Sequence, residues 1–146
     1  MIPNEPVDGV LEFMAKKPVR TAVGLRFGIV AARFNQRITS KLLRACTDTL
    51  AHCGVAANDV QIVRVPGAFE LPLVARTMAR ANRFDAVICL GAVIRGDTPH
   101  FDYICSEVSR GIGQAALETE VPIIFGVLTT ETVAQAEERA DQRQFN

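Results

Sequence analysis

The chain has 146 residues, of which 49% are hydrophobic and 22% charged. This balance is typical of one folded globular domain and excludes a disordered chain. Sixteen Lys and Arg residues balance sixteen Asp and Glu residues, so a general nucleic-acid binder, which is usually basic, is not expected. The formal net charge of +0 also gives little self-repulsion, which permits association with copies of the same chain.

The first 25 residues differ from the rest of the chain. They hold three of the seven prolines and show no sustained periodicity. We interpret them as an N-terminal arm with one helical turn near residues 10–16. One domain is expected over residues 26–146, because no linker, repeat or low-complexity segment divides that stretch.

Regular patterns begin after this arm. The apolar run FGIVAA at residues 27–32 predicts a strand buried on both faces of a sheet. Thr39 is predicted to cap the helix that follows. Gly54 is predicted to stop that helix.

Two further strands and the helix between them follow in the sequence. Residues 60–65 predict a strand, and residues 69–81 predict a helix that keeps Pro72 in its first turn, where no N–H is needed. Residues 86–90 predict the third strand, which Gly91 is expected to close.

The remaining elements complete an alternating order. A helix is expected over residues 101–117, and Gly111 and Gly113 are expected to weaken it. A strand is then expected over residues 121–127, followed by a helix over residues 133–142. Strand and helix thus alternate four times, which predicts an α/β fold with a four-stranded parallel sheet and helices on both faces. Ligands bind such sheets beyond the carboxyl ends of the strands. The loops expected there are 33–37, 66–70, 91–100 and 128–131.

Cysteine spacing and hydropathy predict a cytoplasmic protein. The four cysteines form no C-x-x-C pair, so we expect reduced thiols rather than disulfides. The longest apolar run, residues 86–94, is far shorter than the roughly 18 residues that span a bilayer. No signal peptide, membrane span or membrane partner is therefore expected.

The first candidate functional residue is Phe34, directly after the first strand. At the end of a strand this ring could stack on a planar ligand, or it could close the core.

The second candidate segment is VPGAFELP at residues 65–72. Ala68, Phe69 and Glu70 begin a helix there, so their N–H groups lack partners within the helix. Free amides and one carboxylate suit a polyhydroxyl chain, although Glu70 could simply favour the positive helix end.

The third segment, residues 90–103, leaves a strand and enters a helix. The N–H groups of Gly96, Asp97 and Thr98, with the Thr98 hydroxyl, could form an anion site. The carboxylate of Asp97 would have to turn away from such an anion. His100 could transfer a proton, because histidine titrates near neutral pH. It could also pack on neighbouring rings.

Two more segments permit both a functional and a structural interpretation. Residues 125–130 could bind a ligand or merely end a strand in a turn. Arg139 could meet a phosphate or belong to a solvated helix face. No metal site is expected, because the two histidines are distant and the cysteines are scattered.

Taken together, these segments resemble the 6,7-dimethyl-8-ribityllumazine synthase family, which acts in the penultimate step of riboflavin synthesis. The resemblance covers about residues 26–146. It rests on the blocks ARFN (32–35), VPGAFELP (65–72), LGAVIRGDTPHFDY (90–103) and FGVLTTE (125–131), with Gln135, Ala136 and Arg139 after them.

The resemblance implies a flavodoxin-like three-layer α/β/α sandwich, assembled into homopentamers with active sites between subunits. It implies condensation of 5-amino-6-(D-ribitylamino)uracil with 3,4-dihydroxy-2-butanone 4-phosphate, without cofactor or metal. Phosphate and water leave, and the product is 6,7-dimethyl-8-ribityllumazine.

The resemblance also implies roles for individual residues. Phe34 would stack on the pyrimidine ring, and Phe125 of a neighbouring subunit would form part of the wall. The remaining binding residues would be Ala68, Phe69 and Glu70 for the ribityl chain, and Val93 and Ile94 as backbone partners of the ring.

The phosphate and proton-transfer roles follow in the same way. Gly96, Asp97 and Thr98 would form the phosphate loop, His100 would transfer protons, and Arg139 of the neighbour would bind the phosphate. The residues alone favour Arg95 for the phosphate, whereas the resemblance assigns that role to Arg139.

The sequence departs from the family in two places. It stops at Asn146, before the family's final helix, so apolar surface is expected to be exposed. Residues 140–146 lack the glycines found there in many shell-forming members, which favours a pentamer, or two stacked pentamers, over a shell.

Two alternative functions share part of this sequence pattern. A non-catalytic flavin- or lumazine-binding assembly protein could use the same scaffold, but binding alone needs no proton relay such as His100. A phosphorylation-receiver domain would need acidic residues where Arg33, Phe34, Leu90 and Gly91 stand.

Overall fold

The structure is a computed structural model that describes residues 21–141. Strands and helices alternate along this part of the chain. The strands are β1 (Phe27–Ala32), β2 (Val60–Val65), β3 (Ala86–Ile94) and β4 (Ile123–Thr130). The helices are α2 (Gln36–His52), α3 (Leu71–Arg80), α4 (His100–Thr119) and α5 (Val133–Arg139), with short 3-10 turns η1 (Ala57–Asp59) and η2 (Ala68–Glu70).

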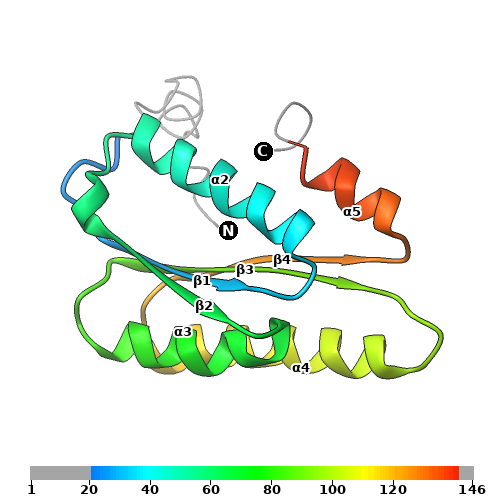
Figure 1. The fold of residues 1–146 in the computed structure, drawn as a ribbon. Coiled ribbons are helices and arrows are strands. Elements are labelled where there is room, and N and C mark those ends of the chain that lie inside the picture. The colour runs from blue at the N-terminus through cyan, green and yellow to red at the C-terminus, as the bar shows by residue number, and fades with distance from the viewer. Residues whose placement is uncertain (1–20, 142–146) are drawn as a thin grey trace, which may run out of the picture.

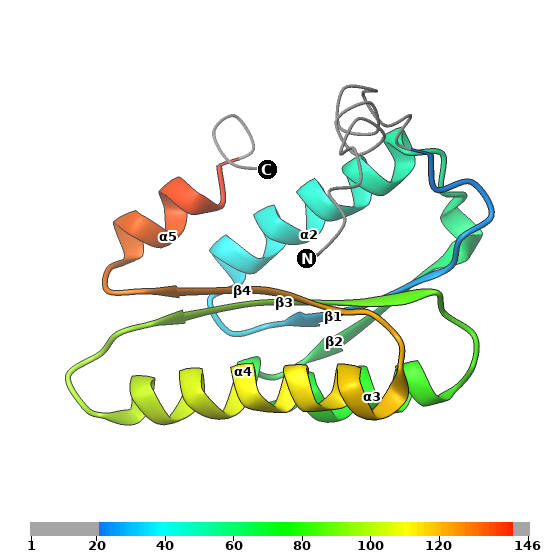
Figure 2. The ribbon, with the colours of Figure 1, turned by 180° about the vertical axis from the view of Figure 1, so that it is seen from behind.

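The four strands form one parallel sheet in the order β2-β1-β3-β4. Helices α2 and α5 cover one face, and α3 and α4 cover the other, as Figures 1 and 2 show from opposite sides. The strand order reverses between β1 and β3, because β2 lies on one side of β1 and β3 on the other. The predicted α/β sandwich with a four-stranded parallel sheet is confirmed.

Alternating residues of β1 point to two separate cores. Val30 and Ala32 belong to the core under α3 and α4, whereas Ile29 and Ala31 belong to the core under α2 and α5. All four are buried almost completely. This period of two is what a strand between two helical layers requires, and it explains the continuous apolar run in the sequence.

The expectation that Thr39 caps a helix is wrong. Helix α2 begins at Gln36, preceded by Asn35 in a left-handed conformation with φ 56°. Asparagine tolerates this conformation better than most residues. The N–H groups of Ile38 and Thr39 donate to the Asn35 carbonyl, so Thr39 is inside the helix and fully buried.

The expectation that Gly91 closes the third strand is also wrong. Strand β3 continues to Ile94 because its pairing with β4 continues from Val87↔Ile123 to Ile94↔Thr130. A Cβ atom at Gly91 would lie 3.1 Å from Leu71 Cδ1. Glycine therefore serves close packing between strand and helix here, and the loop after β3 shortens to residues 95–99.

Three further boundaries differ from expectation. Helix α4 begins at His100, one residue early, and passes through the predicted weak point at Gly111 and Gly113 without a break. Strand β4 ends at Thr130 rather than at residue 127, because it pairs with the longer β3. Helix α5 ends at Arg139. Ala140 and Asp141 lie outside the helix, so the expected continuation to residue 142 is wrong. The expected turn at residues 10–16 lies outside the described residues.

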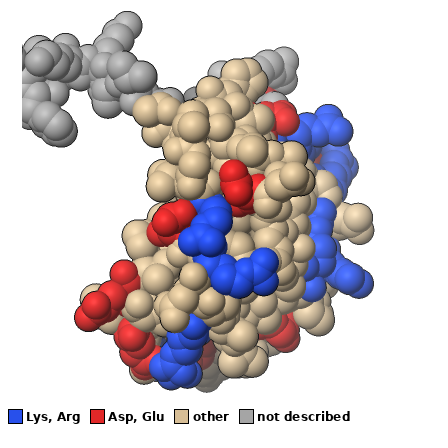
Figure 3. Space-filling view, turned by 90° about the vertical axis from the view of Figure 1, so that its left-hand side faces the viewer, with Lys and Arg blue, Asp and Glu red and all other residues tan. Residues whose placement is uncertain are grey.

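The four cysteines are free, as predicted. Within the described part of the chain, none of the helices has the length and apolar character that crossing a bilayer needs. At the end of the molecule seen in Figure 3, Lys and Arg are interspersed with Asp and Glu, so that face carries no broad field of one sign.

Candidate active site

A cavity of about 750 Å³ lies beyond the carboxyl ends of β1, β2 and β3. This is the point where the strand order reverses, and open α/β sheets bind their ligands there. Most of the lining is apolar, with a few polar groups among it. The residues are Phe34, Pro66, Gly67, Ala68, Phe69, Glu70, Ala92, Val93, Ile94, Gly96, Thr98, His100, Phe101 and Ile104.

The Phe34 ring lines this cavity from the turn between β1 and α2. It is 70% exposed, so it does not close the core. Its backbone N–H donates to the Pro66 carbonyl, and the Asn35 side-chain amide donates to the Ala92 carbonyl at 2.9 Å. The turn is therefore held to both neighbouring strands, which places an aromatic surface at the cavity edge.

The turn after β2 supplies a second wall. Glu70 Oε2 accepts a hydrogen bond of 2.8 Å from the Gly67 N–H, which closes the turn that precedes α3. Ala68 is buried, whereas Phe69 is 57% exposed. This wall therefore presents one carboxylate and one aromatic ring to the cavity at the start of a helix.

The loop between β3 and α4 supplies the third wall. Gly96 and Thr98 line the cavity, and His100 lines it as the first residue of α4. Thr98 Oγ1 accepts a 3.4 Å contact from the His100 N–H. Asp97, which was predicted to belong to the phosphate loop with Gly96 and Thr98, is not among the residues that line this cavity.

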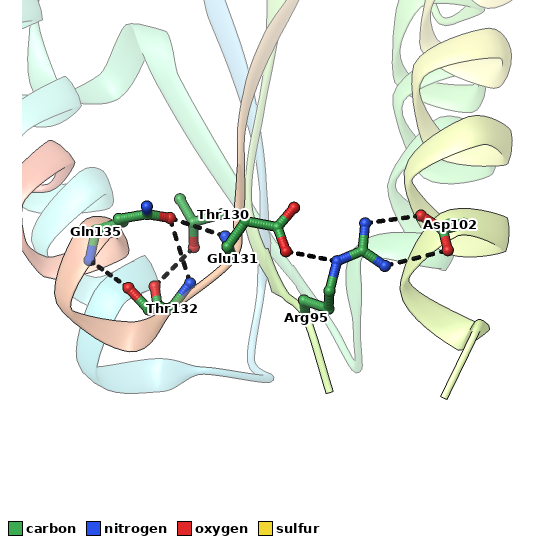
Figure 4. A network of polar contacts seen from close by, with 6 residues as sticks. All are labelled: Arg95, Asp102, Thr130, Glu131, Thr132 and Gln135. Carbon is green, nitrogen blue, oxygen red and sulfur yellow. Dashed lines mark hydrogen bonds and ion pairs between the residues drawn. The ribbon is translucent and has the colours of Figure 1, made fainter. Parts of the chain in front are cut away.

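The guanidinium of Arg95 is paired within the same chain. It binds the carboxylates of Asp102 on α4 and of Glu131 after β4 (Figure 4). The hydrogen bonds to Asp102 and Glu131 raise the pKa of Arg95. The hydrogen bond from Arg95 likewise lowers the pKa of Asp102. Arg95 is therefore held by carboxylates of its own chain, which disfavours it as a direct phosphate ligand.

Two predicted site residues lie away from the 750 Å³ cavity. Arg139 lines a separate cavity of about 360 Å³ with Thr129, Thr130, Glu131, Gln135 and Glu138. Phe125 lines an apolar groove of about 380 Å³ between α2 and strands β3 and β4. The resemblance assigned these two residues to a neighbouring subunit, and within one chain they lie outside the cavity of His100.

Five residues that line the cavity had no predicted function: Pro66, Gly67, Ala92, Phe101 and Ile104. Ile104 lies four residues after His100 and three after Phe101 on α4, and extends the same wall. That spacing is a usable signal, because residues three and four apart share one face of a helix. Asn35 stood inside a recognised block, but its bond to Ala92 joins residues 57 positions apart, which no local pattern indicates.

Comparison with known proteins identifies the family. The sequence model of the 6,7-dimethyl-8-ribityllumazine synthase family matches residues 24–146. A relative with the name 6,7-dimethyl-8-ribityllumazine synthase, from Syntrophus aciditrophicus (strain SB), is 58% identical over 125 residues, covering 86% of this chain and 81% of the relative. By this measure, and with a cavity at the carboxyl ends of its parallel strands, the chain belongs to the 6,7-dimethyl-8-ribityllumazine synthase family.

Proposed function

We propose that this chain condenses 5-amino-6-(D-ribitylamino)uracil with 3,4-dihydroxy-2-butanone 4-phosphate to give 6,7-dimethyl-8-ribityllumazine, a step of riboflavin biosynthesis. The observation that carries the proposal is the 750 Å³ cavity, which brings the Phe34 ring, the Glu70 carboxylate and the His100 imidazole together. These three groups match an aromatic heterocycle, a polyhydroxyl chain and a series of proton transfers.

The pyrimidine substrate would occupy the wall formed by the ends of β1, β2 and β3. Its ring stacks on Phe34, which is exposed toward the cavity, and meets the backbone of Val93 and Ile94. The ribityl hydroxyls meet η2, where Ala68, Phe69 and Glu70 begin a helix and one Glu70 oxygen is already held by Gly67. That bond keeps the carboxylate in place before substrate arrives.

The phosphate would bind at the loop between β3 and α4. Gly96, Asp97 and Thr98 precede the long helix α4, whose N-terminal dipole and N–H groups favour an anion. Arg139 of a neighbouring subunit would supply the guanidinium. The enzyme would accordingly need two copies of the chain for each site.

His100 would move the protons of the reaction. The ring amine attacks the ketone carbon, and loss of water gives an imine. Elimination of phosphate and closure by the second amine follow, and each step transfers a proton. Acid–base groups of this kind contribute about 10²- to 10⁴-fold, and holding two substrates together contributes up to about 7–11 kcal/mol. His100 therefore accelerates the reaction, while the cavity walls supply the rest.

We further propose a homopentamer of chains, each with a domain at residues 26–146 and an N-terminal arm at residues 1–25, in the cytoplasm. Its support is the placement of Arg139 and Phe125 outside the cavity that holds His100, and the apolar groove that Phe125 lines. The four free cysteines support a reducing compartment. Light scattering would test the assembly, because the mass of a full shell or a monomer would contradict it.

The decisive assay mixes the purified protein with both substrates and follows the fluorescence of the lumazine against a blank without protein. The wild type is expected to form product faster than the blank. Product binding without turnover would instead favour a non-catalytic lumazine-binding protein. His100→Ala is expected to lower kcat about 10²- to 10⁴-fold without abolishing turnover.

Shared sites can be tested by mixing two impaired variants. His100→Ala and Arg139→Gln each remove one of the two residues that a site is proposed to take from neighbouring subunits. Random co-assembly of equal amounts of the two variants therefore leaves about one quarter of sites with both residues intact. Activity should then rise well above that of either variant alone. No rise after verified subunit exchange would contradict the assignment of His100 and Arg139 to different subunits.

A further inference from the structure

Arg95 lies at the boundary between two cavities. Its sequence neighbours Ile94 and Gly96 line the 750 Å³ cavity that holds His100. Its own N–H donates at 2.9 Å to the carbonyl of Thr130, a residue that lines the 360 Å³ cavity of Arg139. The contacts that fix the Arg95 side chain therefore influence the position of both cavity walls.

One side of the guanidinium closes the loop that follows β3. Its two terminal nitrogens donate to the two carboxylate oxygens of Asp102, at 3.1 and 2.9 Å (Figure 4). The guanidinium also lies 4.2 Å from the centre of the Phe101 ring. The loop of residues 96–99 begins after Arg95 and ends where α4 begins at His100, so these contacts join the two ends of the loop.

The other side of the guanidinium reaches the start of α5. Arg95 Nε donates to Glu131 Oε2 at 2.6 Å. Gln135 Oε1 accepts from the backbone N–H groups of Glu131 and Thr132, and Thr132 caps the helix. Figure 4 shows the two sets of contacts meeting at Glu131. The helix that ends at Arg139 is thus tied through Glu131 to the loop that precedes His100.

The charges of this network oppose a phosphate if Arg95 is removed. Asp102 and Glu131 are carboxylates beside the two halves of the proposed phosphate site, and Arg95 is the cation that both of them share. Without it, the unneutralised carboxylate of Glu131, which lines the cavity of Arg139, would lie beside a phosphate dianion. These pairs are exposed, with side-chain exposures of 36% for Arg95, 59% for Asp102 and 60% for Glu131. Exposed pairs of this kind contribute little to folding, so a stability role alone explains the network poorly.

We propose that Arg95 is a positioning residue for the phosphate-bearing substrate. Through Asp102 it holds the 96–99 loop and His100 in register, and through Glu131 it cancels a negative charge beside Arg139. The proposal rests on the proposed function, because it assumes that a phosphate binds between this loop and Arg139. It differs from direct phosphate binding, since the guanidinium acts through the two carboxylates.

The two contacts predict separable kinetic effects. Asp102→Asn weakens the closure of the loop but leaves Arg95 on Glu131, so kcat should fall about 10-fold while both KM values stay within about 3-fold. Arg95→Gln removes both contacts. It should lower kcat similarly and raise KM for the butanone phosphate about 10-fold, with KM for the pyrimidine within about 3-fold. Isothermal titration with inorganic phosphate should show a matching loss of affinity in Arg95→Gln.

Two rescue variants separate charge from geometry. Arg95→Gln combined with Glu131→Gln removes the uncompensated charge, so KM for the phosphate substrate should return to within about 3-fold of wild type while kcat stays low. Arg95→Lys keeps a charge but loses the planar fork, so it should rescue KM more than kcat. The matched control is Arg110→Gln, which removes an exposed arginine paired with Glu107 on the same helix. All three kinetic constants should then stay within about twofold.

The wild-type assay separates this inference from the proposed function. A wild type that makes no lumazine overturns the proposed function itself. An active wild type whose Arg95→Gln variant keeps both KM values and kcat within twofold overturns only the role of Arg95. A uniform rise in both KM values, with an unfolding midpoint lowered by more than about 4 °C, would indicate a structural role and also overturn it. If Arg95→Gln does not assemble, unchanged kcat in Asp102→Asn is the overturning result.

Discussion

The two faces of the sheet differ in how completely they are covered. Among residues 21–141, fifteen buried residues form one core under α3 and α4, whereas eight form the core under α2 and α5. The second face also keeps an apolar groove of about 380 Å³, in which Ile124 and Phe125 remain 48% and 44% exposed. The same β-sheet therefore has one closely covered face and one face with apolar surface still accessible.

This difference assigns different tasks to the two faces. The covered face supports two walls of the His100 cavity, because both η2 and the start of α4 pack there. The other face presents Arg139 on α5, and the edge strand β4 carries Phe125; both residues are proposed to serve a neighbouring subunit. Fold stability should consequently depend on the first face more than on the second.

The largest expected effect comes from a core truncation on the covered face. Leu71 is completely buried there, so Leu71→Ala should lower the free energy of unfolding by about 2–5 kcal/mol. Ile124→Ala, on the open face, should cost about 1 kcal/mol or less because its side chain is half exposed. Urea unfolding at matched protein concentration measures both. Equal losses would remove the distinction between the faces.

A smaller effect is expected where α3 and α4 approach each other. A Cβ atom at Gly111 would lie 2.8 Å from Pro72 Cβ, and the rigid proline ring cannot move aside easily. Gly111→Ala should thus destabilise the fold by about 1–3 kcal/mol, despite the better helix propensity of alanine. Gly113, on the same helix, has no neighbour within 4 Å. Gly113→Ala should stabilise by about 0.5–1 kcal/mol, and a loss there would contradict this account.

Thiol labelling compares the faces without any substitution. Cys89 points into the covered core, and burial raises its pKa to about 12. Cys46 is only partly buried and lines the open groove, and this partial burial also raises the pKa of its thiol. Because the thiolate is the reactive form, a maleimide should modify Cys46 in the native protein and Cys89 only after unfolding. Peptide mass spectrometry distinguishes the two sites, and equal labelling rates would show that the covered face opens as readily as the groove.

The smallest effect concerns the network that bridges the two faces. The Arg95 hydrogen bond lowers the pKa of Asp102 below the ordinary range of an aspartate. Since the folded pKa lies below the unfolded one, this bond stabilises the fold above the unfolded pKa, and the contribution is lost as pH falls through the folded pKa. Carbon-13 NMR titration should show the Asp102 carboxyl titrating at a lower pH in wild type than in Arg95→Gln. Identical titrations would mean that the bond is absent in solution.

Local patterns predicted the elements better than their ends. Both bounds of β1 and β2 were predicted correctly. For β1 the reason is that a strand buried on both faces must be apolar throughout, whereas β2, which contains Gln61 and Arg64, is only partly buried. The ends of β3 and β4 were missed, since each is set by pairing with the other strand rather than by its own residues. The start of α2 was missed because it depends on one left-handed residue, Asn35.

The candidate site shows the same limit. Phe34, Glu70 and His100 were found because each occupies a loop at the carboxyl end of a strand, and the topology brings those loops together. The roles of Phe125 and Arg139 came from the family resemblance, because neither lies in that cavity. The contact of Arg95 with Glu131 spans 36 residues, and no periodicity indicates a side-chain pair at that separation.

The extension of β3 to Ile94 has a mechanical consequence. Its last pairs with β4 place the hydrogen-bonded ladder between the two cavities, with Ile94 on one side and Thr130 on the other. Paired strands resist sliding past each other far better than a loop does, so a displacement of Ile94 in one cavity wall would also move Thr130 in the other. A substitution that bends the paired ends of β3 and β4 would therefore change the shape of both cavities together.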